Sequence, residues 1–299
     1  MCTVVAKYFS KEGWTVVKNR DQNYLPTVTF KDKDIGKLGE ILVVYDKSTN
    51  YNEGMNQAGI TIVTATLAPR SELEHDAADG IRIYDALMKD SVEDAAKLLK
   101  SRKMTGYTFI FDKETFILIE GARENGTGEY HSTMRKVSKD EIVVRTNYGT
   151  DLPWAGYIMG QTDKMDKQRL SSESRRAFIE KAAPKAKNPR ELLNLMSAKY
   201  TNNLQLNPFR VATEDRQMRT ILQCLLIPKN LAFYIVPVQT KLEVKTDREY
   251  VHAYILPNDH IFDTYGSKIK NFIKSNVAIK ATGADDVTTF KGFIKKDIK

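Results

Sequence analysis

Residues 1–5 read Met-Cys-Thr-Val-Val, and residues 18–21 read Lys-Asn-Arg-Asp. Removal of Met1 would leave a thiol and a free α-amino group on one residue, Cys2. The α-amino group has an ordinary pKa of about 7.7–8.0, so a useful neutral fraction near physiological pH can accept a proton. A thiol, with an ordinary pKa of about 8.5, is driven towards thiolate by a nearby cation. Cys2 can therefore supply both a nucleophile and its general base, without a histidine.

The segment that joins these two stretches predicts a β-hairpin. Residues 3–9 and 14–18 are strand-like, and residues 10–13 form the turn. The hairpin brings residues 18–21 alongside Cys2, where a cation favours the thiolate and a carboxylate orients the amine. The alternative is structural: a free cysteine often packs as a small apolar residue, and charges at strand ends contribute little to stability.

Composition limits the classes to which this protein can belong. The chain has 299 residues, of which 41% are hydrophobic and 28% charged, as in ordinary globular proteins. No apolar run approaches the length of about 18 residues that indicates a membrane span, and the N-terminus lacks the pattern of a signal peptide. Two cysteines, Cys2 and Cys224, make no disulfide framework. These features predict a soluble, cytoplasmic protein with no membrane partner.

The net charge of +8 raises the question of a nucleic-acid partner. Most lysines are scattered, and the two denser basic clusters lie within residues 181–190 and 291–299. Neither is interleaved with the aromatic residues typical of a single-strand binding groove. We expect a solvated basic surface and no specific nucleic acid, with attraction of an anionic substrate or partner as the alternative. The four histidines show no zinc-binding spacing and no phosphate-binding loop is present, so we expect no metal or cofactor.

Hydrophobic patterning predicts an alternation of strands and helices in the rest of the chain. Residues 25–37 are mixed and polar, residues 51–59 are rich in turn formers, and residues 121–128 and 160–169 are expected to be loops. A helix is expected to start at Ser171 or Ser172, which would cap it. The predicted helices are 71–103, in two parts, 171–181 and 189–197. The predicted strands are 41–45, 60–67, 107–111, 115–120, 134–137, 141–145, 220–227 and 231–238.

Three motifs in this order resemble one superfamily. They are Met1-Cys2, the Lys-Asn-Arg-Asp of residues 18–21, and the Gly-Met-Asn-Gln-Ala-Gly-Ile of residues 54–60 before a strand. Together they are similar to the N-terminal-nucleophile (Ntn) hydrolases of the penicillin V acylase, bile salt hydrolase and acyl-CoA:6-aminopenicillanate acyltransferase group. The resemblance covers roughly residues 2–240, and it rests on the order and spacing of these motifs.

The resemblance implies a fold. It is an α+β, four-layer αββα sandwich, in which two mainly antiparallel sheets pack face to face and helices cover them. We expect one Ntn-hydrolase-like domain over residues 1–299, with residues 241–299 a C-terminal elaboration of a sheet edge.

The resemblance also implies site residues. Asp21 matches the family's acid, whereas Lys18 stands where many relatives have arginine, so either Lys18 or Arg20 takes that role. Asn147, in Thr-Asn after a strand, matches the side-chain donor to the oxyanion, and Thr66 lies near a second donor position.

The Ser-Ser-Glu-Ser-Arg of residues 171–175 is similar to the family's helix start, which makes Arg175 an active-site residue. Outside the motifs, Arg210 and Arg219 are candidate substrate-binding residues, with a surface position as the alternative.

These assignments predict an N-terminal cysteine amidohydrolase that cleaves a linear, small-molecule amide through a thioester. Acyl transfer to an amine at the same site is one alternative. A non-catalytic binding or structural protein on the same fold is another, and retained Met1 would favour it. The sequence leaves a homo-oligomer, the acyl group and the leaving amine open.

Overall fold

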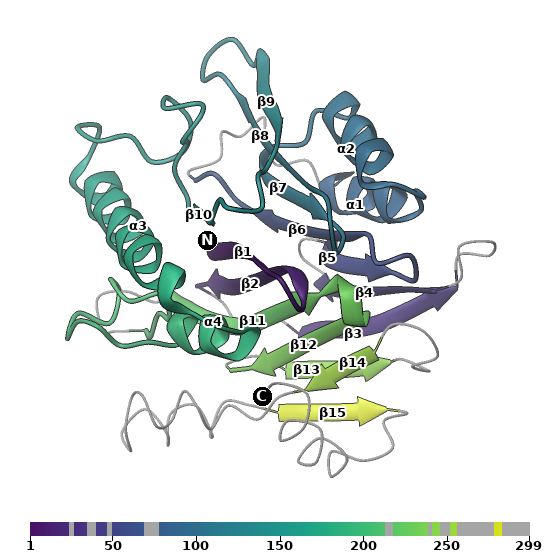
Figure 1. The fold of residues 1–299 in the computed structure, drawn as a ribbon. Coiled ribbons are helices and arrows are strands. Elements are labelled where there is room, and N and C mark those ends of the chain that lie inside the picture. Colours follow the sequence, from purple (N-terminus) through teal and green to yellow (C-terminus); the bar gives the residue numbers. More distant parts are fainter. Residues whose placement is uncertain are drawn as a thin grey trace.

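Two β-sheets packed face to face, with helices on both outer faces, make up the fold seen in the computed structural model (Figure 1). The structure describes residues 1–23, 27–34, 40–46, 50–68, 78–212, 218–238, 241–245, 252–255 and 278–282. The predicted four-layer α+β sandwich is confirmed.

The first sheet carries the N-terminus. Its described strands run in the order β10-β1-β2-β11-β12-β14, and all its pairings are antiparallel except β12 with β14. The bounds are β1 Cys2–Phe9, β2 Gly13–Gln22, β10 Val143–Arg145, β11 Arg219–Ile227, β12 Ala232–Pro237 and β14 His252–Ile255. The predicted hairpin of β1 and β2 is confirmed, and it places Cys2 directly opposite Arg20.

The second sheet lies over the first, with its described strands in the order β15-β13-β3-β4-β5-β6-β7-β8-β9. From β3 to β9 the pairings are antiparallel, whereas β13 pairs in parallel with β3 and β15. The bounds are β3 Thr27–Asp34, β4 Glu40–Asp46, β5 Asn50–Asn56, β6 Thr61–Ala65, β7 Gly106–Phe111, β8 Phe116–Arg123, β9 Tyr130–Lys136, β13 Lys241–Lys245 and β15 Ala278–Thr282. The assignment of residues 241–299 to the same domain stays a prediction.

Helices α1 and α2 lie against the second sheet, and α3 and α4 lie against the first (Figure 1). The helices are α1 Ala78–Leu87, α2 Val92–Ser101, α3 Asp163–Ala182 and α4 Pro189–Met196, with short 3-10 turns η3 Ala183–Lys185 and η4 Pro228–Asn230. The side-chain oxygens of Ser91, Thr162 and Asn188 accept main-chain hydrogen bonds at the starts of α2, α3 and α4. These caps fix where three of the helices begin, because they satisfy N–H groups that have no partner within the helix.

Strand alternation builds three apolar layers between the four structural layers. On β1, Cys2 and Val4 face the second sheet, whereas Val5 and Phe9 face α3 and α4. This follows from the two-residue period of a strand, which sends neighbouring side chains to opposite faces. Trp14 is fully buried between the sheets and meets Phe116 edge-on, with ring centroids 4.8 Å apart. The strand starting at Cys2 is therefore fixed by packing on both faces.

The structure corrects several sequence-based assignments. Residues within 25–37 form β3, and residues 50–56 form β5 although they are rich in turn formers. Strand β8 continues to Arg123, into the predicted loop of residues 121–128. Helix α3 begins at Asp163, inside the predicted loop of residues 160–169, so Ser171 and Ser172 lie within the helix and do not cap it. Of the predicted helical region 71–103, residues 71–77 lie outside the described residues.

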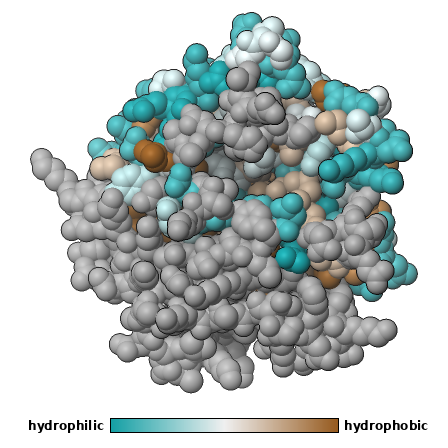
Figure 2. Space-filling model, turned by 180° about the vertical axis from the view of Figure 1, so that it is seen from behind, coloured by the Kyte–Doolittle hydropathy of each residue, from teal (hydrophilic) through white to brown (hydrophobic). Residues whose placement is uncertain are grey.

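The face opposite that of Figure 1 is mainly hydrophilic over its described part, with small hydrophobic patches between (Figure 2). None of the helices that the structure describes is long and apolar enough to cross a membrane.

Candidate active site

Strand β2 sends its charged residues to two different places. Lys18 and Arg20 point between the sheets, on the same face as Trp14 and Val16, while Asn19 and Asp21 point towards α3 and α4. All four polar residues are at most 3% exposed. Because such burial is rare for charged groups without partners, their contacts decide what they do.

Two ion pairs connect the sheets beside Cys2. Lys18 pairs with Glu53 of β5, and Nη2 of Arg20 lies 2.8 Å from Oδ2 of Asp46 on β4. All four side chains are almost fully buried. Each cation is thus held near Cys2 by a carboxylate of the opposite sheet. Lys18 and Arg20, the two residues predicted to take the role of the arginine found in many relatives, therefore both lie between the sheets. Of the two, Lys18 lowers the pKa of the Cys2 thiol more.

The electrostatics at Cys2 favour the thiolate. The side chain is 5% exposed, and burial by itself raises the pKa of the thiol. Lys18, then the terminal ammonium and Arg20, outweigh burial, so the pKa of Cys2 lies below its ordinary value. Burial also lowers the pKa of the Met1 amino group and brings the pKa of Lys18 to about 8.

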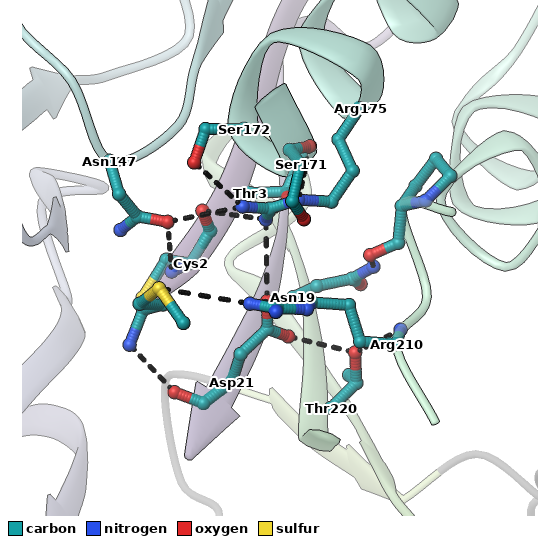
Figure 3. A network of polar contacts seen from close by, with 12 residues as sticks. Cys2, Thr3, Asn19, Asp21, Asn147, Ser171, Ser172, Arg175, Arg210 and Thr220 are labelled. Carbon is teal, nitrogen blue, oxygen red and sulfur yellow. Dashed lines mark hydrogen bonds and ion pairs between the residues drawn. The ribbon is translucent and has the colours of Figure 1, made fainter. Parts of the chain in front are cut away.

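Asp21 lies at the centre of a second network, on the helix side of β2 (Figure 3). Its Oδ1 accepts from the Thr220 hydroxyl at 2.8 Å, and its Oδ2 lies 3.4 Å from Nη1 of Arg175 and 3.9 Å from Nη1 of Arg210. All four side chains are buried. A carboxylate with these partners is held in one orientation.

Arg175 joins this network to Cys2 (Figure 3). Its Nη1 donates to the Cys2 carbonyl at 3.3 Å and to the Thr3 hydroxyl at 2.5 Å. Its Nη2 donates to Oδ1 of Asn147 at 3.3 Å and to the Ser172 hydroxyl at 3.1 Å. The planar guanidinium thus fixes the start of β1 and the amide of Asn147 together, a task that a single ammonium cannot perform.

Asn147 follows β10 and reaches both Cys2 and Thr66. Its Oδ1 accepts from the Cys2 main-chain N–H at 3.3 Å, and its Nδ2 donates to the Thr66 carbonyl at 2.7 Å. An amide nitrogen carries two hydrogens, so the second is a candidate donor to an oxyanion. The loop after Asn147 is fixed by the buried carboxylate of Glu120, which accepts from the N–H groups of Thr150, Asp151 and Leu152 at 2.9–3.0 Å.

Met1 is present and occupies part of this region. Its amino group donates to the main-chain oxygen of Asp21 at 2.8 Å, and its carbonyl accepts from the Asp21 N–H at 2.8 Å. The contact predicted between the Cys2 α-amino group and the Asp21 carboxylate stays a prediction, because the carboxylate contacts Thr220 and Arg175 here and the terminal amine is that of Met1.

The structure brings most of the predicted site residues together. Cys2, Asp21, Asn147 and Arg175 share one network, Thr66 adjoins Asn147, and Lys18 and Arg20 approach Cys2 from between the sheets. Whether each acts in catalysis stays a prediction.

The two remaining arginines differ from each other. A surface position is wrong for Arg210, which is fully buried and held by Gln205 through its Nε and Nη2 at 3.2 and 2.6 Å. Arg219 begins β11 opposite Gln22 and is only partly buried, and among the described residues no hydrogen bond or ion pair joins it to this network.

Sequence reasoning missed Thr3, Ser172 as a partner of Arg175, Thr220 and Tyr157. Two local signals point to some of them: Thr3 shares a strand face with Val5, and Ser172 lies one helical turn before Arg175. Thr220 and Tyr157 arrive from distant segments and carry no such signal. Burial raises the pKa of Cys224 to about 12, so its thiol stays protonated, in keeping with the packing role expected of it.

The described His, Cys, Asp and Glu residues contain one group with metal-ligand spacing, exposed on the β8–β9 hairpin: Glu124, Glu129 and His131. Exposed acidic groups of this kind are common without a metal.

Comparisons with known proteins give structural relatives only. No protein-family model matches the chain, and no curated protein matches it by sequence. Among solved structures, penicillin V acylase from Agrobacterium tumefaciens is similar, with 15% identity, a TM-score of 0.46 and coverage of 79% of this chain and 86% of that one. A Caenorhabditis elegans orthologue of N-acylethanolamine-hydrolyzing acid amidase has 11% identity, a TM-score of 0.48 and coverage of 77% and 93%.

A mutant of the conjugated bile acid hydrolase from Clostridium perfringens is also similar, with 12% identity, a TM-score of 0.45 and coverage of 80% of this chain and 90% of that one. Penicillin V acylase and bile salt hydrolase are members of the group that the sequence motifs resemble. The function is argued below from the site itself.

Proposed function

We propose that this protein is an N-terminal cysteine amidohydrolase that cleaves a linear amide through a thioester. The observation that carries the proposal is the setting of Cys2. It is the second residue of the chain, its thiol pKa is lowered, and its main-chain nitrogen donates to Asn147 within a network that contains Arg175 and Asp21.

The first step forms the acyl-enzyme. After Met1 is removed, the neutral α-amino group of Cys2 accepts the Sγ proton, and Sγ attacks the carbonyl carbon of the amide. The oxyanion that develops is stabilised by an N–H of Asn147, with the main chain near Thr66 as second donor. The ammonium group returns its proton to the leaving nitrogen as the carbon–nitrogen bond breaks, which leaves a thioester on Cys2.

The second step restores the enzyme. The α-amino group accepts a proton from water, the hydroxide oxygen adds to the thioester carbon, and the thiolate leaves and is protonated. Lys18 and Arg20 stabilise the thiolate in both steps, and Arg175 positions Cys2 and Asn147. Asp21 holds Arg175 through its carboxylate. Arg210 is a candidate substrate-binding residue; Arg219 is a weaker candidate, because it lies outside the network.

A matched set of variants tests the proposal. Purified protein whose intact mass shows the loss of Met1 is incubated with a panel of chromogenic acyl amides, and acid and amine products are both quantified. We expect the wild type to release both products in equal amounts, and Cys2→Ala to release neither. Release by Cys2→Ala at the wild-type rate would contradict the proposal. An acylated amine formed when free amines are added would reassign the same site to acyl transfer.

A further inference from the structure

Met1 makes polar contacts at both of its ends, and all of them end when it is removed. Its amino group and carbonyl exchange two main-chain hydrogen bonds with Asp21, each 2.8 Å long. This is the pattern of a hydrogen-bonded antiparallel pair, so Met1 extends β1 by one residue against β2. At the other end, Sδ accepts from the Tyr157 hydroxyl at 3.1 Å and lies 3.7 Å from Nη1 of Arg210.

The groups that contact the thioether are fixed from behind. Gln205 accepts from Arg210 at 2.6 Å and in turn donates to the carbonyls of Val211 and Met218 at 2.6 and 2.9 Å. The main chain at Tyr157 is held by Arg169, whose Nη1 donates to its carbonyl at 2.8 Å. Burial raises the pKa of Tyr157, so the hydroxyl keeps its proton as a donor. The Tyr157 hydroxyl and Nη1 of Arg210 are therefore both held in orientations that point at the sulfur of Met1.

Removal of Met1 leaves these groups in place. The main-chain N–H and C=O of the buried Asp21 lose their hydrogen bonds to Met1, and the hydroxyl of Tyr157 loses the sulfur, whereas Nη1 of Arg210 keeps Oδ2 of Asp21 at 3.9 Å. Buried polar groups are nearly always hydrogen-bonded, so a ligand that supplies these partners gains affinity over one that does not. The acceptor that suits a tyrosine hydroxyl and a guanidinium best is an oxygen, not a thioether sulfur.

Met1 is also the acyl group nearest to the nucleophile. Its carbonyl carbon is bonded to the nitrogen of Cys2, the residue whose Sγ accepts the substrate's acyl group in the proposed reaction. We infer, on the basis of the proposed function, that the groups contacting Met1 form an acyl-group subsite that takes an aminoacyl residue with a side-chain oxygen acceptor, as in a glutaminyl or glutamyl amide. The amino group of this residue donates to the main-chain oxygen of Asp21, its side-chain oxygen accepts from Tyr157 and Arg210, and its carbonyl is the one that the oxyanion donors of the proposed function receive.

Four coumarin amides test this inference on the full-length protein after loss of Met1 is verified by mass. They are the glutaminyl, glutamyl, norleucyl and hexanoyl amides of 7-amino-4-methylcoumarin. Norleucine has the length of methionine but no acceptor, so we expect kcat/KM for the glutaminyl and glutamyl amides to exceed that for the norleucyl amide at least about tenfold. Tyr157→Phe should lower this ratio several-fold.

Tyr130→Phe is the matched control, because it removes a hydroxyl that donates to the Met104 carbonyl at 2.9 Å on the β8–β9 hairpin. It should leave the ratio unchanged. A norleucyl amide cleaved as well as the glutaminyl amide, or an unchanged ratio in Tyr157→Phe, would overturn the inference. Cleavage of the hexanoyl amide alone would do so while the proposed function stands. If no amide is cleaved and Cys2 is not acylated, the proposed function fails and the inference fails with it.

Discussion

Replacement of Arg175 tests whether one guanidinium organises the site. Its Nη1 and Nη2 contact Cys2, Thr3, Asp21, Asn147 and Ser172 at 2.5–3.4 Å, and the side chain is fully buried. Arg175→Met removes one partner of a buried ion pair, which typically costs about 3–5 kcal/mol of the free energy of unfolding. For a protein of this size, each kcal/mol lowers Tm by about 2–4 °C, so we expect a fall of about 6–20 °C.

Arg175→Lys separates the charge from the geometry. Lysine keeps the positive charge but offers one nitrogen where arginine offers two, so it cannot hold Asp21 and Asn147 in the same way. We expect a smaller loss of Tm than in Arg175→Met, together with a fall in kcat of about 10²-fold, the usual effect of small misplacements in an active site. Differential scanning calorimetry and amine release from an acyl amide are the two measurements.

Arg190→Met on α4 is the control, because Arg190 is an exposed helix arginine. It should change Tm by less than about 2 °C, since surface substitutions usually stay within ±0.5 kcal/mol. The reasoning would be refuted if Arg175→Met kept both the Tm and the kcat of the wild type. That result would mean that Arg175 contributes neither to stability nor to the activity of the site.

Three further outcomes follow from the same geometry. Asn147→Ala should lower kcat by about 10²–10³-fold through loss of an oxyanion donor; a loss below threefold in a stopped assay would exclude that role. Lys18→Met removes the cation that most lowers the pKa of the Cys2 thiol, so the rising limb of kcat/KM against pH should move to higher pH, and an unmoved or lower limb would contradict the assignment. Iodoacetamide at neutral pH should alkylate Cys2 well before Cys224, whose pKa is near 12, and peptide mapping that finds Cys224 modified first would count against the electrostatic account.

The fold was predictable where local patterns and long-range packing agree. The β1–β2 hairpin, helix α4 and the β11–β12 pair have alternating or helical apolar patterns bounded by turn residues, and these elements were predicted from the sequence. Strand β5 was not, because Asn50–Asn56 is composed of residues that favour turns. It becomes a strand through pairing with β4 and β6.

Gly54 illustrates what the composition of β5 hides. A Cβ at this position would lie 2.5 Å from Cδ1 of Leu87 in α1 and 2.8 Å from Cγ1 of Val43 in β4. The glycine therefore lets helix α1 pack closely onto the sheet, a requirement that propensity alone does not express. The first half of α3 was missed for a different reason: it is almost entirely polar, so it has no apolar stripe, and it is supported by its Thr162 cap and the Arg169–Glu173 pair at 2.6 Å.

The contacts of the candidate site that form within one hairpin were predictable, whereas those between distant segments were not. Cys2 and Asp21 are brought together by one hairpin, whose register follows from its turn. Glu53 and Asp46, the partners of Lys18 and Arg20, come from the opposite sheet, and no local pattern specifies contacts between sheets. The burial of Arg210 was missed in the same way, because its contacts with Gln205 and with the sulfur of Met1 form only in the folded chain.

The central claim is that Cys2 acts from a free N-terminus. The most direct measurement is the intact mass of enzyme quenched in acid during turnover, followed by sequencing of its N-terminal peptide. We predict a peptide that begins at Cys2 and carries the acyl group on sulfur, removable by neutral hydroxylamine. A turnover-competent enzyme that retains Met1, or an acyl group found on any other residue, would contradict it.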